Sequence, residues 1–218
     1  MIRSRQASPS GPAEPLRRGR PREFDREAAL IRAVELFWEN GFEGTSLKGL
    51  TKAMGISAPS LYAAFGSKED LFREAVEFYN DPQRSPTARA LRDEPSARAA
   101  VEALLRENAR SYADPQTPRG CLIVLSATTY TPASTGMRDL LRDLRDRDRR
   151  DLRLRLDRAV ADGELSGSAD TSALTGYVMT VLHGLSTQAR DGADASTLDA
   201  IVDLAMSGWE HAVRQSRS

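Results

Sequence analysis

The sequence predicts an all-α protein of about nine helices. Apolar residues recur at spacings of three and four along most of its 218 residues, as on the buried face of an amphipathic helix. Serine, threonine or aspartate precedes many of these segments and glycine follows several, which is the pattern of helix caps. No segment has the alternating pattern of a strand, and the sequence shows neither an internal repeat nor a glycine-rich phosphate loop.

The composition is typical of a globular chain, with 40% hydrophobic residues, 28% charged residues and a formal net charge of zero. The single cysteine, Cys121, excludes an intramolecular disulfide. Two histidines offer no spacing typical of a metal site, so we expect neither a metal nor a cofactor. No apolar stretch approaches the roughly 20 residues of a membrane span, and the basic N-terminus lacks the apolar core of a secretory signal. We therefore expect a cytoplasmic protein without a membrane partner.

Three short helices are predicted in an N-terminal domain over residues 23–70, with Gly55 forming a sharp turn before the third. Their expected bounds are Asp25 to Gly41, Thr45 or Ser46 to Met54, and Ala58 to Phe65. The apolar residues that would pack them together are Leu30, Val34, Phe37, Leu47, Leu50 and Leu61. This pattern is a helix-turn-helix, whose third helix stays on the surface and can enter the major groove of DNA. A fourth helix over residues 68–79, capped by Ser67, would link this domain to the rest.

The third helix has small exposed side chains, which allow a helix to lie deep in a groove. Serine hydroxyls can meet phosphates or bases, and alanine methyl groups can touch thymine methyl groups. The residues concerned are Ser57, Ala58, Ser60, Ala63 and Ala64.

Five segments at fixed spacing carry a resemblance to a known family. They are Ala33-Val34-Glu35-Leu36-Phe37, Gly41-Phe42-Glu43-Gly44-Thr45-Ser46, Gly55-Ile56-Ser57, Ser60-Leu61-Tyr62, and Phe65-Gly66-Ser67-Lys68-Glu69-Asp70-Leu71-Phe72. Over residues 24–72 this succession resembles the DNA-binding domain of the TetR family. The resemblance implies a repressor that binds a palindromic operator in double-stranded DNA as a homodimer and leaves it when a small-molecule effector binds.

The resemblance also implies roles for individual residues. Tyr62 and Lys68 would hold the phosphate backbone, as would Thr45 or Ser46, with Lys48, at the start of the second helix. The residues facing the groove would be Ser57, Ala58, Pro59 and Ser60. Small residues stand at positions 58–59 and 63–64, where the family often has basic, glycine, polar or aromatic residues. We therefore expect few base hydrogen bonds and a larger contribution from thymine contacts and DNA shape.

Residues 1–22 carry six arginines and one glutamate but few apolar residues, so we expect a disordered basic arm. Arg18, Arg20 and Arg22 alternate with Gly19 and Pro21 just before the first helix. An extended segment of this kind is narrow enough to lie in an A·T-rich minor groove. The alternative is a solvated tail without a role in binding.

Residues 80–218 are expected to form a helical ligand-binding and dimerisation domain, beginning with a polar linker over residues 81–93. The predicted helices span Pro95–Ala113, Arg119 to about Thr129, Thr135–Asp162, Thr171–Arg190 and Asp194 to about Gln215. The run of Arg and Asp over residues 138–158 is interpreted as a solvated helix face with i,i+4 ion pairs. Recruitment of a charged ligand is the alternative for this run.

The last two predicted helices have apolar stripes on more than one face, as in the four-helix dimer interface of TetR proteins. The candidate interface residues are Leu174, Val178, Val181, Leu198, Ile201, Val202, Met206 and Trp209. Gly176 and Gly184 in the first of these helices would allow close contact. The alternative is that both helices only close the core of a single chain.

The family's ligand pocket lies among the middle helices. Mostly apolar residues with a few polar tips could line it here, namely Tyr112, Cys121, Leu122, Leu125, Tyr130, Tyr177 and His183. A plain core role explains these residues equally well.

Other functions are less well supported by the sequence. A Cys121–His183 dyad can be drawn, but nothing near it indicates an activated nucleophile, so we expect no catalytic residues and no enzyme. A thiol sensor at Cys121 remains an alternative, as does a transcriptional activator, because operator position separates activators from repressors. The neutral net charge disfavours a non-specific architectural DNA binder.

Overall fold

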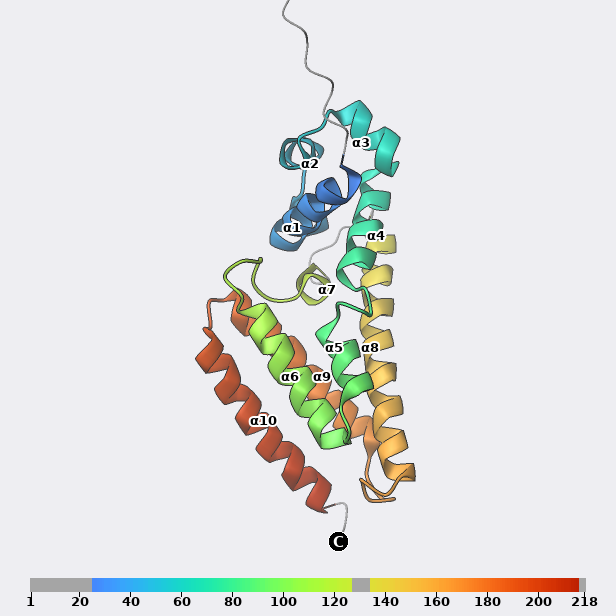
Figure 1. Ribbon diagram of the computed structural model, residues 1–218, viewed down its shortest axis with the longest axis vertical. Coiled ribbons are helices and arrows are strands. Elements are labelled where there is room, and N and C mark those ends of the chain that lie inside the picture. The colour runs from blue at the N-terminus through green and yellow to red at the C-terminus, as the bar shows by residue number, and fades with distance from the viewer. Residues whose placement is uncertain (1–24, 127–133, 216–218) are drawn as a thin grey trace, which may run out of the picture.

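The computed structural model describes residues 25–126 and 134–215, and every regular element within these ranges is a helix (Figure 1). The predicted all-α fold is confirmed, with ten helices in the described ranges rather than about nine. Helices α1–α3 form one end of an elongated molecule, α4 leads away from them, and α5–α10 form a larger bundle (Figure 1). The bounds are α1 (Arg26–Gly44), α2 (Leu47–Met54), α3 (Ala58–Phe65), α4 (Lys68–Tyr79), α5 (Pro86–Asp93), α6 (Ala97–Tyr112), α7 (Leu122–Leu125), α8 (Thr135–Ala161), α9 (Thr171–Arg190) and α10 (Ala195–Gln215).

Aromatic side chains hold α1–α4 together. The Phe72 ring of α4 packs edge-on against Phe37 and Phe42 of α1, with ring centroids 5.0 and 5.2 Å apart. Edge-to-face aromatic pairs gain stability beyond the apolar area that they bury. The predicted core of this end is confirmed, since the buried residues include Leu30, Val34, Phe37, Leu50 and Leu61, with Leu47 partly buried.

The segment that the sequence analysis treats as a polar linker contains helix α5, so that prediction was wrong. The Ser85 side chain caps this helix by accepting a hydrogen bond from the Ala88 N–H at 3.2 Å. Pro86 occupies the first turn, where its missing N–H costs nothing. Only Thr87, Ala90 and Leu91 are buried, a set too small to show a helical period within a charged segment.

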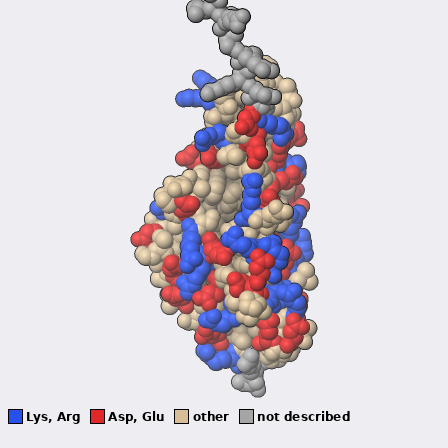
Figure 2. Space-filling view, viewed as in Figure 1, with Lys and Arg blue, Asp and Glu red and all other residues tan. Residues whose placement is uncertain are grey.

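The Arg/Asp run of α8 lies mostly on a solvated face, as predicted. Asp139 pairs with Arg142 and Arg153 pairs with Asp157, each at 3.1 Å and within one helical turn. Arg155 is an exception, because its side chain is buried, 3.5 Å from the Glu164 carboxylate. Figure 2 shows Lys and Arg interspersed with Asp and Glu over the visible face of the bundle.

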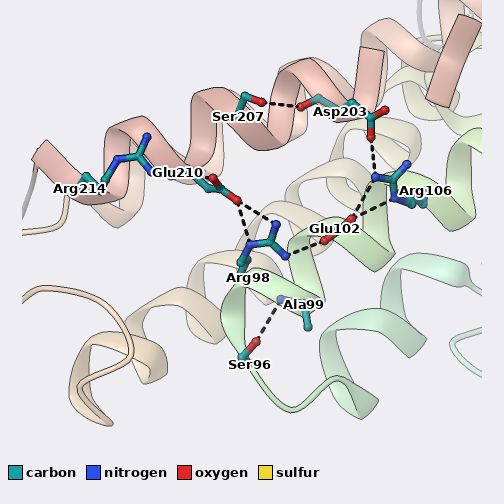
Figure 3. A network of polar contacts seen from close by, with 9 residues as sticks. All are labelled: Ser96, Arg98, Ala99, Glu102, Arg106, Asp203, Ser207, Glu210 and Arg214. Carbon is teal, nitrogen blue, oxygen red and sulfur yellow. Dashed lines mark hydrogen bonds and ion pairs between the residues drawn. The ribbon is translucent and has the colours of Figure 1, made fainter. Parts of the chain in front are cut away.

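Charged side chains fasten α10 to α6 (Figure 3). The Arg98 guanidinium donates to Glu210 at 2.9 Å and to Glu102 at 2.8 Å. The Arg106 guanidinium donates to the same Glu102 at 3.0 Å and to Asp203 at 2.6 Å. Exposed ion pairs of this kind add little stability individually. The ion pairs border the face of α10 whose apolar residues, among them Leu198, Val202 and Trp209, are buried.

Candidate nucleic-acid interface and internal cavity

The turn between α2 and α3 places the start of α3 at the surface. Gly55 adopts a left-handed conformation with φ of 68°, which ends α2 without the steric cost that a Cβ atom would add. Two residues later the Ser57 hydroxyl accepts a hydrogen bond from the Ser60 N–H at 3.2 Å and so caps α3. The two hydroxyl oxygens of Ser57 and Ser60 lie 2.8 Å apart. Both serines are exposed at the N-terminal end of the helix.

Helix α3 has one buried and one exposed side. Leu61 and Phe65 are buried against the rest of the domain. The residues predicted to face a groove, Ser57, Ala58, Pro59 and Ser60, are all exposed. Tyr62 on the same helix is 48% exposed, so its hydroxyl is available to a partner and the tyrosine is not part of the core.

Of the two predicted caps of α2, Ser46 takes the position. Its hydroxyl accepts a hydrogen bond from the Gly49 N–H at 3.0 Å, and Ser46 and Lys48 are both exposed. Thr45 is buried instead, and its hydroxyl donates to the Gly41 carbonyl at 2.7 Å. The Thr45 hydroxyl therefore supports the end of α1 and does not face solvent, contrary to the role offered for it as an alternative to Ser46.

Lys68 begins α4 and lies against the aromatic core. Its Nζ atom is 4.2 Å from the centroid of the Phe42 ring, a cation–π distance. Burial lowers the pKa of the Lys68 ammonium, while the nearby carboxylates of Glu43 and Glu69 act in the opposite direction. The ring fixes the ammonium beside α1, at the end of the molecule that carries α3.

Sequence reasoning missed Arg26, which joins the start of α1 to α3 and α4. Its guanidinium lies 4.5 Å from the centroid of the Phe65 ring and donates to the Glu74 carboxylate at 2.7 Å. These partners are 39 and 48 residues away in the chain, so no local pattern points to them. The predicted arm residues Arg18, Arg20 and Arg22 lie outside the described residues, as does Tyr130.

A cavity of about 150 Å³ lies within the bundle, lined by residues from α4 to α9 and the connections between them. Three of the predicted pocket residues line it, namely Tyr112, Cys121 and His183. Leu122 is fully buried in the core, and Leu125 lines a separate cleft with Trp38 and Arg190. Tyr177 lies elsewhere on α9, where its hydroxyl donates to the Ala205 carbonyl of α10 at 2.8 Å.

Burial favours the neutral form of four ionisable groups that line the cavity, namely Tyr79, Tyr112, Cys121 and His183, near pH 7. Burial raises the pKa of the Tyr79 and Tyr112 hydroxyls, with the neighbouring Cys121 acting in the same direction. Burial also raises the pKa of the Cys121 thiol, against the effect of the Val124 N–H and the Tyr79 hydroxyl. For His183, burial together with Arg145 and Arg149 lowers the pKa to about 4.

Asp148 and Arg145 also line the cavity, although the sequence analysis placed neither there. Burial, with Asp151 in addition, raises the pKa of the Asp148 carboxyl to about 6. Burial lowers the pKa of the Arg145 guanidinium, which donates from Nη1 to the Ile123 carbonyl at 3.2 Å. Both residues belong to the Arg/Asp run over residues 138–158, where thirteen other arginines and aspartates make these two hard to single out from the sequence.

Two family matches divide the chain as the structure does. Residues 30–75 match the bacterial regulatory proteins of the tetR family, and residues 97–205 match the tetracyclin repressor-like C-terminal domain. The chain belongs to the TetR family. This family consists of DNA-binding transcriptional regulators and is not an enzyme family.

Named TetR-type proteins align with nearly the whole chain. The transcriptional repressor ComR of Escherichia coli (strain K12) is 34% identical over 198 residues, which is 90% of this chain and 94% of ComR. The transcriptional repressor BdcR of the same strain is 30% identical over 192 residues, which is 86% of this chain and 90% of BdcR. A cysteine mutant of the TetR regulator CifR, solved with 26-base-pair operator DNA, has a TM-score of 0.82 at 46% identity. That match covers 87% of this chain and 98% of the CifR chain.

The two C-terminal helices of this TetR protein bury most of the predicted dimer residues within one chain. The buried set is Leu174, Val178, Leu198, Val202, Met206 and Trp209, while Val181 and Ile201 are partly buried. The exposed residues of the same helices include Ala173, Tyr177, Thr180, Gly184, Ala200, Leu204 and Gly208. These exposed residues can contact a second chain directly. Leu204 is the most prominent apolar residue among them, at 74% exposed.

The described residues contain neither a cluster of metal ligands nor a helix suited to span a membrane. No three histidine, cysteine, aspartate or glutamate side chains in residues 25–126 and 134–215 gather closely enough to hold a metal ion. No helix in the same ranges combines the length and apolar character that a membrane crossing requires.

Proposed function

We propose that this TetR protein is a homodimeric repressor that binds a palindromic operator through α3 and leaves it when a small molecule occupies the internal cavity. The observation that carries the proposal is the exposed face of α3, where a row of small side chains ends at Tyr62. Small side chains let the helix axis approach the base edges, and the exposed hydroxyls can meet phosphates.

The operator complex of CifR supports the DNA-binding part of the proposal, because that protein is 46% identical to this chain. The names of ComR and BdcR, both repressors, support repression rather than activation. On this basis Ser46, Lys48, Tyr62 and Lys68 contact the DNA backbone, while residues 57–60 face the bases.

The exposed faces of α9 and α10 support the homodimer. Leu204 and Tyr177 present apolar surface there, and no described residue beyond the neighbouring helix backbone lies within 4 Å of where a Cβ atom would stand on Gly176 or Gly184. Two copies packed on this face form an isologous contact, which gives the two α3 helices two-fold symmetry. Such symmetry matches a palindrome whose half-sites are about 34–36 Å apart or a multiple of it.

Helix α4 supports a link between the cavity and α3. Its first residue, Lys68, lies at the DNA-binding end, and its last residue, Tyr79, lines the cavity. The Tyr79 ring also packs edge-on against Trp38 of α1, with ring centroids 4.8 Å apart. An occupant that shifts Tyr79 therefore shifts both helices that hold α3, and a coupling of about 1–3 kcal/mol would change operator occupancy usefully.

Titration of labelled DNA from the region flanking the gene, with random DNA of equal length as competitor, tests the proposal. We expect the wild-type chain to bind the operator at least about 10³-fold more tightly than random DNA. Tyr62→Ala should lose about tenfold to hundredfold in affinity, as expected for a hydrogen bond to a charged group of about 1.5–3 kcal/mol. Tyr62→Phe separates the hydroxyl from the ring. Equal binding of operator candidates and random DNA by the wild-type chain would contradict the proposal.

A further inference from the structure

Arg145 and Asp148 lie one helical turn apart on α8, and both line the cavity, yet they do not pair. The Arg145 guanidinium and the Asp148 carboxylate, both described, form no ion pair within 4.0 Å of each other. The same order and spacing in α1 gives a pair at 2.8 Å between Arg32 and Glu35. Arg145 is instead held by its hydrogen bond to the Ile123 carbonyl at 3.2 Å.

The Asp148 carboxylate accepts no hydrogen bond from any described residue. A second acceptor that lines the cavity, the Asn108 carbonyl oxygen, is also open. The Asn108 amide nitrogen donates to Thr87 and to the Leu104 carbonyl, at 3.0 and 2.8 Å, and its own carbonyl oxygen accepts nothing from the described part of the chain. A charge taken out of water without a partner is costly. Among the described residues the cavity therefore presents one carboxylate and one guanidinium, both partly buried and not paired with each other.

Arg84 also lines the cavity but is already neutralised at its rim. Its guanidinium lies 4.4 Å from the Phe78 ring centroid and 3.8 Å from the Asp81 carboxylate, and the side chain is mostly exposed. The charge balance inside the cavity is therefore set by Arg145 and Asp148.

We propose that the effector is a small zwitterion of amino-acid type, whose ammonium group binds Asp148 and whose carboxylate binds Arg145. This inference rests on the proposed function, because it assigns a chemical class to the effector of the same cavity. A volume of about 150 Å³ is well above the roughly 10–15 Å³ that a cavity needs to hold one water. Such a space fits glycine, alanine or β-alanine, whereas a ligand with a single charge leaves either Arg145 or Asp148 unpaired.

The same assignment makes binding depend on pH. The groups around Asp148 are Arg145, Arg147 and Asp151 on its own helix, Tyr79 on α4, Arg84 before α5, Tyr112 on α6, Cys121 before α7 and His183 on α9. Burial raises the pKa of the two tyrosines and the cysteine, and it lowers the pKa of His183 to about 4. Asp148, with a pKa of about 6, is thus the cavity group that changes charge between pH 5 and pH 8. Its ammonium partner should bind less tightly as the pH falls below about 6.

Calorimetric titration of the full-length protein tests this assignment with glycine, L-alanine, β-alanine and 4-aminobutyrate, which differ in the separation of their two charges. Propionate and ethylammonium serve as the matching single-charge fragments. We expect at least one zwitterion to bind saturably, at least tenfold more tightly than either fragment, and tenfold more weakly at pH 5 than at pH 7.5.

Variants of Asp148 and Arg145 test which residue binds each charged group of the ligand. Asp148→Asn and Arg145→Gln should each weaken zwitterion binding at least tenfold, and Asp148→Asn should also abolish the pH dependence. Asp143→Asn is the matched control, because Asp143 is exposed on the same helix and its ion-pair partner among the described residues is Arg142 at the surface. Circular dichroism checks folding, and the wild-type pH series stands even if one variant fails to fold.

Several results would overturn the assignment: no zwitterion binds, a single-charge fragment binds equally well, or affinity is unchanged in both variants. Operator binding without any ligand is measured on the same preparation. If the operator is bound but no zwitterion is, the effector assignment alone fails. If the wild-type chain has no operator preference, the proposed function fails whatever the cavity binds.

Discussion

Asp148 and His183 face the same cavity, and burial shifts their pKa values in opposite directions. The Asp148 pKa rises from 3.8 to about 6, so between these values the folded chain holds a proton that the unfolded chain has lost. Asp148 therefore favours folding at low pH, and this contribution is lost as the pH rises from about 4 to 6. The His183 pKa falls from 6.5 to about 4, so His183 acts against folding as the pH drops through the same range. The two effects largely cancel in the wild-type chain.

Replacing Asp148 removes one of these two opposed effects. Asp148→Asn should raise the free energy of unfolding at pH 7.5 by up to about 3 kcal/mol, since each unit of pKa shift corresponds to about 1.4 kcal/mol. At pH 3.5 the carboxyl is protonated in both states, and the gain should nearly vanish. Urea unfolding of the wild-type chain, Asp148→Asn and the surface control Asp143→Asn at both pH values measures the difference. A gain of equal size at the two pH values would contradict the assigned pKa.

The Cys121 thiol bears on the alternative of a thiol sensor. Because burial raises its pKa, the reactive thiolate is scarce at neutral pH, and the side chain is only 9% exposed. We expect iodoacetamide at pH 7.5 to alkylate the folded protein at least tenfold more slowly than the urea-unfolded chain. Mass spectrometry reads the reaction directly, because the chain has one cysteine. Equal rates in the two states would favour the sensor.

Among the elements, the junction before α7 depends on a glycine in a crowded place. Gly120 has φ of 81°, and a Cβ atom there would lie 2.7 Å from the Ser186 carbonyl oxygen and 2.7 Å from Leu125 Cδ1. Next to it the Cys121 N–H donates to the Ser186 hydroxyl at 2.9 Å. This contact joins the cavity wall to α9, so the chain must pass very close to that helix.

A pair of glycine variants separates crowding from backbone strain. Gly163 has a similar φ of 78°, but a Cβ atom there would meet no described residue within 4 Å apart from its chain neighbours. Gly163→Ala should cost about 1–2 kcal/mol of stability, the price of a left-handed conformation. Gly120→Ala should cost about 1–3 kcal/mol more, because a backbone oxygen cannot move aside as a flexible side chain can. Thermal unfolding compares the two variants, and equal losses would show that crowding at Gly120 is relieved.

The sequence predicts elements well where the cause is local. Ser46, Ser57 and Ser67 cap helices three residues from their hydrogen-bond partners, so the start of each of these helices can be predicted from a short segment. The inward position of Asp148 depends instead on where α4, α6 and α9 pass, which no nearby residue reveals. The apolar stripes of α9 and α10 could not be divided in advance between core and dimer face either, because a core face and a dimer face are both apolar.

At the scale of the whole molecule, contacts of α1 with α9 and α4 help to join the DNA-binding end to the bundle. Arg190 at the end of α9 donates to the Glu39 carbonyl of α1, and Trp38 beside it packs on Tyr79 of α4. The Trp38 indole nitrogen is buried without a hydrogen-bond partner among the described residues, so this junction is held by packing more than by polar bonds. A junction of this kind can shift without breaking a polar network, as a regulator that changes the spacing of its two α3 helices requires.

That spacing exists only in the proposed dimer, and Leu204 offers a direct test of it. Leu204 is 74% exposed on the face of α10 turned away from α6, where the ion pairs of Arg98 and Arg106 hold the helix in one orientation. A two-fold contact contains this position from both copies, so the substitution buries two carboxylates in the interface. Leu204→Glu should therefore weaken the dimer at least tenfold in sedimentation experiments and weaken operator binding with it, while the fold stays intact. Leu154→Glu is the matched control, because Leu154 is 65% exposed on α8. If Leu204→Glu remains as dimeric as Leu154→Glu, then α10 does not form the contact and the two half-sites must be spanned by another face.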